Sequence, residues 1–223
     1  MIRMKKRLLV FLPFLLFVAG VFTSCEEVEE AGKYDNWQER NETYIDSLSL
    51  IVNGRIDRII EGGVYEGDNG DSAKLAKIPV GELFAIKDTY ASTDGNPQYI
   101  YCKKIKGDNR EGGQRPLYTQ SFSAYYYGTI ITGEKFDGNF TGYSAIDRGT
   151  LDAKEKGPTD FDSPSTFSVT GVITGWTAIV QYMHTDERWM VYVPYQCAYK
   201  ESGRGSIPGY TALIYDMELV SVE

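Results

Sequence analysis

The side chains that usually carry out nucleophilic, acid–base or zinc chemistry are scarce in this chain of 223 residues. It contains a single histidine, His184, and three cysteines. Zinc sites assembled from His and Cys, and catalytic triads centred on a histidine, therefore have almost no residues to draw on. The sequence also lacks a phosphate-binding loop, a dinucleotide-binding fingerprint and a zinc-protease motif. We therefore predict no metal site and no cofactor.

Aromatic residues and glycine dominate the composition instead. The chain has 17 Tyr, 10 Phe, 3 Trp and 23 Gly, a combination that favours a β-rich fold with many turns. Hydrophobic residues make up 42%, which is enough for a sizeable core. The formal net charge is −8, and residues 1–24 hold four cations, which leaves 19 Lys and Arg against 31 Asp and Glu beyond them. Such an acidic chain is a poor partner for polyanions, so we predict no nucleic-acid partner.

The N-terminus has the features of an export signal. A basic segment at Arg3–Arg7 precedes an apolar run from Leu8 to Phe22, which is short for a bilayer span and typical of a signal peptide. Small residues then lead into Cys25, as in bacterial lipoprotein signals, where this cysteine becomes the lipidated first residue. We predict a lipoprotein signal peptide at 1–24 and a lipid anchor on Cys25 that attaches the protein to a membrane. Ordinary cleavage, which leaves a free thiol at Cys25, stays open as the alternative.

An acidic tether follows at 25–34, with four glutamates close behind the cysteine. This cluster resembles the surface-export signals of some outer-membrane lipoproteins, and it fits a plain solvated tether equally well. We therefore expect an outer-membrane lipoprotein of the cell envelope that faces the periplasm or the cell surface. Export permits disulfides, but Cys102 and Cys197 fall on separate predicted strands with no geometric ground for pairing. We predict two buried free thiols.

A helical pattern occupies the next part of the chain. From Asn36 to about Ile60, apolar residues recur at steps of three and four, which indicates one helical face. Asn53-Gly54 weakens the middle of this pattern, so the residues fit either one helix or two. A glycine-rich loop and a short apolar run, Val80–Ile86, come next. We assign residues 35–97 to an N-terminal helical extension.

The alternation typical of β-strands begins near Gln98. The predicted strands are Tyr99–Ile105, Ser121–Thr132, Arg188–Pro194 and Thr211–Val222. One helix interrupts them, since four apolar residues follow Gly175 at helical spacing: Trp176, Ile179, Val180 and Met183. Residues 138–166 are acidic and show no regular period, so we expect a long loop there. The predicted fold class is α+β: an antiparallel sheet wrapped around one short helix, preceded by a helical segment.

The C-terminal half contains five ordered motifs. They are Tyr126-Tyr127-Gly128; Thr132-Gly133-Glu134-Lys135-Phe136-Asp137; Phe167 with Val172-Ile173-Thr174-Gly175-Trp176; Val193-Pro194-Tyr195-Gln196-Cys197-Ala198-Tyr199; and Ile207-Pro208 with Leu213-Ile214-Tyr215-Asp216-Met217-Glu218-Leu219. In this order they resemble the motifs of the FKBP-type peptidyl-prolyl cis-trans isomerases. The resemblance implies an FKBP-like antiparallel sheet and an isomerase domain over residues 98–223, with an insertion at 138–166. It does not extend to residues 31–90.

The resemblance also implies an aromatic pocket, with Trp176 as its floor at the start of the helix. Asp137 would lie at the rim, and the backbone N–H of Ile173 and the hydroxyl of Tyr199 would donate hydrogen bonds to substrate carbonyls. Val172 would serve the core or the pocket equally well. Carried over position by position, the catalytic residues are Tyr126, Phe136, Asp137, Phe167, Val172, Ile173, Trp176, Tyr199, Ile207 and Tyr215.

The sequence departs from the family pattern at several positions. Lys200 stands where a glycine usually follows the loop tyrosine, so we expect that loop to bend differently. Tyr215 stands where Phe is commonest, and a buried hydroxyl there needs a partner. Ser165 replaces a second pocket Phe and would make one wall more polar. The insertion at 138–166 would border the pocket and select or occlude substrates.

The activity that the resemblance implies fits the scarcity of catalytic side chains. A peptidyl-prolyl isomerase rotates X-Pro bonds without breaking a bond, so it requires neither a nucleophile nor a metal. The implied partners are proline-containing polypeptides, whose folding after export the enzyme would assist, and macrolide-type inhibitors. Two alternatives stay open. One is a non-catalytic peptide-binding or chaperone module, and the other makes the N-terminal helix a dimerisation or docking arm.

Overall fold

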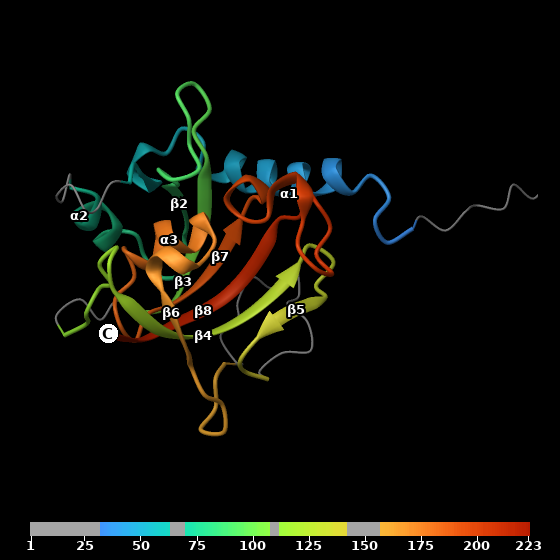
Figure 1. Ribbon diagram of the computed structural model, residues 1–223. Helices are drawn as coiled ribbons and strands as arrows, with labels where there is room; N and C mark the ends of the chain where they lie inside the picture. Colours follow the sequence, from blue (N-terminus) through green and yellow to red (C-terminus); the bar gives the residue numbers. More distant parts are fainter. Residues whose placement is uncertain (1–31, 63–69, 108–111, 142–156) are drawn as a thin grey trace, which may run out of the picture. The chain divides into compact units, whose positions relative to one another are not determined.

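A computed structural model describes residues 32–62, 70–107, 112–141 and 157–223 (Figure 1). The chain divides into a unit that ends at Asp35 and a compact unit, Asn36–Glu223, that holds every helix and strand given below. The predicted signal peptide, Cys25, most of the acidic tether and the middle of the predicted insertion lie outside the described residues. Within the described ranges, no helix combines the length and the apolar character that crossing a bilayer requires.

The N-terminal extension contains one long helix followed by short elements. Helix α1 spans Trp37–Val52 and ends where Gly54 adopts a φ of 77°, a left-handed conformation that glycine reaches without strain. The helical pattern therefore stops at Val52, and the residues that follow form other structures. These are the 3-10 helix η1 (Ile56–Arg58), strand β1 (Ile59–Ile60), helix α2 (Asp71–Ala76) and strand β2 (Leu83–Lys87).

The strands of the described residues join in one sheet with the order β1-β2-β3-β7-β8-β4-β5, and β6 pairs with β4 (Figure 1). All pairs are antiparallel except β1 with β2. Helix α3 (Thr174–Val180) is the one α-helix between the C-terminal strands in the described ranges. The remaining strands are β3 (Tyr99–Lys106), β4 (Ser121–Ile130), β5 (Lys135–Gly138), β6 (Ser165–Ser168), β7 (Arg188–Val193) and β8 (Leu213–Val222).

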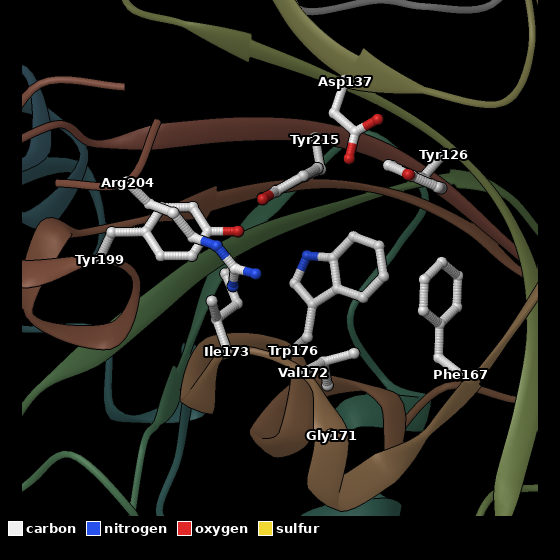
Figure 2. A pocket seen from close by; sticks show the side chains of 10 residues that line it. All are labelled: Tyr126, Asp137, Phe167, Gly171, Val172, Ile173, Trp176, Tyr199, Arg204 and Tyr215. Carbon is white, nitrogen blue, oxygen red and sulfur yellow. The ribbon is translucent and has the colours of Figure 1, made fainter. Parts of the chain in front are cut away.

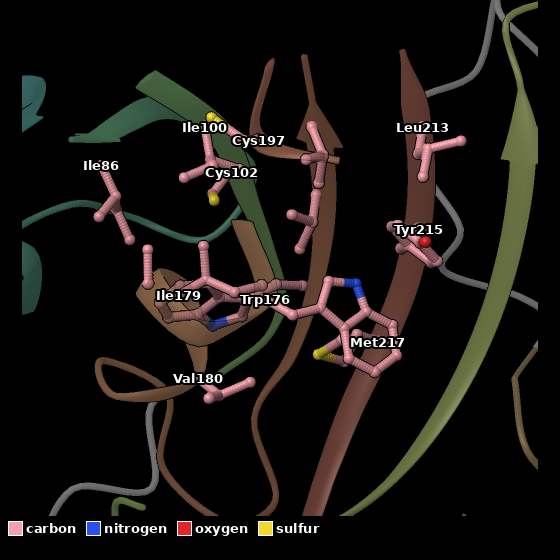
Figure 3. Close-up of a cluster of buried hydrophobic side chains, with 14 of the residues drawn as sticks. Ile86, Ile100, Cys102, Trp176, Ile179, Val180, Cys197, Leu213, Tyr215 and Met217 are labelled. Carbon is pink, nitrogen blue, oxygen red and sulfur yellow. The ribbon is translucent and has the colours of Figure 1, made fainter. Parts of the chain in front are cut away.

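Each face of the sheet is covered by a helix. Trp176, Ile179 and Val180 of α3 pack into the larger buried cluster, which Figure 3 shows in close-up. Leu48 and Val52 of α1 belong to a second cluster on the other face. Strand β8 contributes to both, because successive side chains of a strand point to opposite faces. Leu213, Tyr215, Met217 and Leu219 join the cluster around α3, whereas Ile214 joins the cluster under α1.

The predicted fold class is confirmed, and the four predicted strands correspond to β3, β4, β7 and β8. Three short strands were not among the predicted ones: β1, β5 and β6, which have two, four and four residues. These are too short for a β period to emerge. Ile59–Ile60 of β1 fell within the predicted helical pattern, so the prediction was wrong there, and the first residues of β6 fell within the expected loop. The apolar run Val80–Ile86 contains most of β2. Cys102 and Cys197 are buried free thiols, as predicted.

A buried ion pair connects β7 to β8 close to the sheet centre. The Nε–H of Arg188 donates to Oδ1 of Asp216 at 2.7 Å, and a second bond joins Nη2 to Oδ2. The Asp216 side chain is fully buried and that of Arg188 is 10% exposed. Two parallel bonds of this kind hold both charges in a fixed geometry. Asp216 therefore serves the fold rather than a solvated surface.

We predict that Asp216→Asn strongly destabilises the protein. The amide keeps the shape of the carboxylate, but it removes the negative charge that pairs with the buried Arg188 guanidinium. The free energy of unfolding, measured by denaturant titration, should fall by about 3–5 kcal/mol.

Glu218→Gln is the matched control on the same strand, because Glu218 pairs at 2.9 Å with Lys106, whose side chain is 51% exposed. An exposed pair contributes about 0–1 kcal/mol. Similar small losses in both variants would contradict a structural role for the buried pair.

Candidate functional site

The segment that leads into α3 brings three of the predicted residues close together: Val172, Ile173 and Trp176. A 3-10 helix, η3 (Val169–Gly171), leads into an extended stretch at Val172 and Ile173, and Thr174 starts the helix. The hydroxyl of Thr177 donates to the carbonyl of Val169 at 2.7 Å and holds this turn against the helix. Trp176 therefore projects from the first turn of α3, directly beside the extended stretch.

Aromatic rings from three strands surround the indole of Trp176. Its ring centroid lies 5.2 Å from Tyr126 on β4, 5.4 Å from Phe167 on β6 and 5.0 Å from Tyr215 on β8. All three contacts are edge-to-face, with interplanar angles of 73–83°. Such pairs contribute about 0.5–1.5 kcal/mol each beyond the burial of area. Trp176 is only 4% exposed, so it forms a rigid floor.

A glycine of the first motif makes room for the wall behind this floor. Gly128 on β4 pairs in register with Tyr215 and lies opposite Asp137 of β5. A Cβ atom at Gly128 would come within 2.7 Å of the Phe136 ring and 2.9 Å of the Tyr215 ring. The two rings meet edge-to-face at 5.6 Å across this space. Phe136 thus supports Tyr215 from behind.

Tyr126 and Asp137 lie next to each other at the pocket rim (Figure 2). Burial raises the pKa of the Tyr126 hydroxyl, and the neighbouring Asp137 carboxylate raises it further. Burial likewise raises the pKa of Tyr215 well above its usual value. Both phenols therefore keep their protons at neutral pH and act as neutral donors. Asp137 accepts the N–H of Gly138 at 2.8 Å, which fixes its orientation at the rim.

The segment between β7 and β8 supplies the opposite wall. It contains the 3-10 helices η4 (Tyr195–Cys197) and η5 (Lys200–Ser202). Tyr199 lies between them, and the guanidinium of Arg204 lies over its ring at 5.5 Å from the centroid. Figure 2 shows Tyr199 and Arg204 on one side of Trp176, and Tyr126 and Phe167 on the other.

Helix α1 holds the end of this wall in place. The indole N–H of Trp37 donates to Oγ1 of Thr211 at 2.9 Å, and the N–H of Ala212 donates to Oδ1 of Asn41 at 2.9 Å. Trp37, Asn41 and Thr211 are all buried. The N-terminal extension therefore forms part of the support for the loop that presents Tyr199.

These elements enclose a pocket with a volume of about 390 Å³, within the range of small-molecule sites (Figure 2). Two predicted residues do not line it. Phe136 lies behind Tyr215, and Ile207 is buried in the core cluster around α3. The sequence did not indicate Gly171 or Arg204, although Arg204 is the only cation in the glycine-rich stretch 202–209. The lining residues are Tyr126, Asp137, Phe167, Gly171, Val172, Ile173, Trp176, Tyr199, Arg204 and Tyr215.

Two donors in the pocket lack acceptors. The buried Nε1–H of Trp176 has no hydrogen-bond partner among the described residues. The backbone N–H of Ile173 likewise donates to no atom in the described part of the chain. A buried donor without an acceptor is unfavourable, and a ligand that supplies a carbonyl oxygen removes that cost.

The structure shows where the residues that depart from the family pattern lie. Ser165 does not make a wall more polar, because its hydroxyl accepts a bond from Asn139 at 3.1 Å and does not line the pocket. Tyr215 places its hydroxyl at the pocket, on the side of Tyr199 (Figure 2). From the predicted insertion, the described residues 138–141 and 157–166 contribute nothing to the lining. Lys200 adopts a φ of 56°, so lysine takes a backbone conformation typical of glycine.

Comparison with known proteins identifies the family. Residues 112–220 match the model of the FKBP-type peptidyl-prolyl cis-trans isomerases, and this part of the chain belongs to that family. The FKBP-type peptidyl-prolyl cis-trans isomerase FkpA of Aeromonas hydrophila is 32% identical over 139 residues, which cover 62% of this chain and 42% of the relative. FK506-binding protein 2 of Dictyostelium discoideum is 34% identical over 99 residues, which cover 44% of this chain and 62% of the relative.

The chain thus spans less than two thirds of the length of these relatives. A crystal structure of FkpA from Escherichia coli is similar over 85% of this chain and 71% of that chain, with 20% identity and a TM-score of 0.45. The family match covers the strands from β4 to β8 that surround the pocket.

We predict that Lys200→Gly stabilises the protein by about 0.5–1 kcal/mol. A left-handed conformation costs a residue with a Cβ about 1–2 kcal/mol, and part of this gain is offset by the greater freedom of glycine in the unfolded state. Denaturant titration measures the change. Lys200→Ala is the control, since it removes the same charge and keeps the Cβ. Equal stability of the two variants would rule out backbone strain at this position.

Proposed function

We propose that this protein catalyses cis–trans isomerisation of X-Pro peptide bonds in polypeptides, within the pocket floored by Trp176. The observation that carries the proposal is an aromatic pocket of about 390 Å³ whose floor and edge present hydrogen-bond donors without acceptors. The membership of residues 112–220 in the isomerase family supports it.

The chemistry of the reaction matches what the pocket offers. Rotation about an X-Pro bond takes tens to hundreds of seconds unaided, because amide resonance resists twisting. No bond is broken, and in the twisted state the C–N bond loses its double-bond character. An apolar pocket favours this less polar arrangement over the planar one more than water does. Catalysis of this kind is stronger binding of the transition state than of the ground state.

The proposed roles of the residues in and behind the lining follow from their positions. Trp176 and Phe167 form the apolar surface that receives the proline ring. The N–H of Ile173 and the hydroxyl of Tyr199 donate to carbonyls of the bound peptide. Tyr126 and Asp137 form the rim of the pocket. Phe136 and Ile207 act from behind the lining, as supports of Tyr215 and of the loop.

The domain organisation proposed from the sequence assigns 1–24 to a lipoprotein signal peptide, 25–34 to a tether and 98–223 to the isomerase domain. The extension at 35–97 works with that domain, since α1 bonds to the loop that carries Tyr199. The motif at Cys25 supports a lipid anchor in the cell envelope. An exported isomerase at that place assists the folding of exported proteins, whose X-Pro bonds isomerise slowly.

The pocket is also the proposed site for a macrolide inhibitor. One relative is named for binding FK506. The apolar lining around Trp176 would receive such a ligand in place of the proline ring, so FK506 should compete with peptide substrates in the assay below.

We predict that the protein accelerates cis-to-trans conversion of a proline-containing tetrapeptide. Tyr199→Phe should lower kcat/KM about threefold to tenfold, because it removes one hydrogen bond to the bound peptide. Trp176→Phe should lower it at least as much, because it removes both the Nε1 donor and part of the floor. Circular dichroism and thermal unfolding establish that each variant is folded.

Tyr195→Phe is the matched control, since the Tyr195 hydroxyl contacts Glu42 of α1 at 3.4 Å and does not line the pocket. Its kcat/KM should stay close to the wild-type value. Absence of any acceleration would refute the isomerase activity. Peptide binding without acceleration would instead establish a binding module.

We predict that Cys25 carries the lipid. When the full chain is expressed in bacteria with labelled palmitate, the wild type should incorporate label and sediment with membranes. Cys25→Ala should lose the label and shift to the soluble fraction, whereas Cys102→Ala, which removes a buried thiol, should keep both properties. An unlabelled wild-type protein would exclude the anchor.

A further inference from the structure

Arg204 lies in the pocket lining but has no part in rotating the X-Pro bond. Its side chain is exposed, and its guanidinium lies over the ring of Tyr199. In the described part of the chain it forms no salt bridge. The pocket therefore presents a positive charge that no carboxylate of the described residues neutralises.

The backbone around Arg204 is held in a fixed geometry. Its N–H and C=O form a reciprocal pair of hydrogen bonds with Ile207, each 2.9 Å long, which closes a tight hairpin. Gly203 has a φ of 67°, and a Cβ there would lie 2.3 Å from the carbonyl oxygen of Ile207. Ile207 is buried in the core cluster. The hairpin is thus anchored to the core, and it directs the guanidinium over Tyr199.

The opposite side of the pocket carries a negative charge. Asp137 lies across the pocket from Arg204, past Tyr215 and next to Tyr126 (Figure 2). The pocket therefore has a positive side at Arg204 and a negative side at Asp137. A carboxylate on a bound peptide is attracted to Arg204 and repelled by Asp137. The two charges therefore favour one orientation of an acidic peptide in the pocket.

We propose that Arg204 makes the pocket selective for polypeptides with an aspartate or glutamate side chain directly adjacent to the proline. A guanidinium fits a carboxylate with two parallel hydrogen bonds, and the Tyr199 ring holds it in the required plane. The inference rests on the proposed isomerase function, because the proline ring must occupy the floor at Trp176. It adds to that function the chemical class of the preferred substrate.

The test compares end-blocked peptides that differ only in Glu or Gln beside the proline, in one series before it and in another after it. For wild-type protein, kcat/KM should be about fivefold higher for Glu than for Gln in one series, the upper range for an exposed ion pair. Arg204→Gln should bring the ratio close to one. Arg204→Glu should invert it and favour a Lys peptide. Salt of about 1 M should weaken the preference, because it screens exposed charges.

Arg55→Gln is the matched control, since it removes an exposed arginine that does not line the pocket. It should preserve the wild-type ratio. Turnover of Gln and Glu peptides at equal rates in both series would overturn the selectivity and leave the isomerase function intact. If no peptide is isomerised, the proposed function fails. Titration then gives the dissociation constants of the Glu and Gln peptides. Equal constants would overturn the proposed selectivity, whereas tighter binding of the Glu peptide that is lost in Arg204→Gln would support it.

Discussion

Aromatic rings from β4, β6 and β8 meet edge-on around the indole of Trp176, and this packing connects the helix to the sheet at the pocket. The indole must stay buried to complete the core and must also expose one side to a ligand. Both conditions hold because α3 begins directly beneath the strands, after the extended stretch at Val172 and Ile173. A pocket floor that belongs to the core cannot move without disturbing the fold, so it is preorganised for the proline ring that the proposed function requires.

The remaining wall depends on a different support. Tyr199 and Arg204 lie on a loop, and loops are generally the more mobile parts of a structure. Here the loop is fixed at its end by two hydrogen bonds with α1, one donated by Trp37 and one accepted by Asn41. Along its length it is fixed by the hairpin that closes at Ile207. The N-terminal extension thus contributes to the pocket without lining it. Because of its position, helix α1 both covers one face of the sheet and stabilises this loop.

Local periodicity was enough to predict the long strands and the helix at Trp176, because each pattern is set by residues close in sequence. Strand β1 could not be predicted, since two residues have no period and their pairing depends on β2. The role of α1 could not be predicted either, because the hydrogen bond that Ala212 donates to Asn41 joins residues 171 positions apart. Arg204 escaped prediction for a related reason. An exposed arginine in a glycine-rich turn looks like ordinary surface until the hairpin directs it over Tyr199.

The distribution of charge around the pocket is consistent with the proposed reaction. Rotation about an amide bond needs an apolar floor and neutral donors, so a charge at Trp176 would favour the planar, more polar amide. Charged groups are therefore compatible with the reaction only at the edge, where Asp137 and Arg204 lie. A chain with a net charge of −8 repels acidic polypeptides at long range. A single arginine held close to the bound peptide attracts a peptide carboxylate at short range. The Coulomb attraction is strongest there, and salt screens it least. The residue beside the proline is thus recognised at the pocket edge, away from the floor where the X-Pro bond would rotate. Side chains at the edge can therefore be substituted without loss of the pocket.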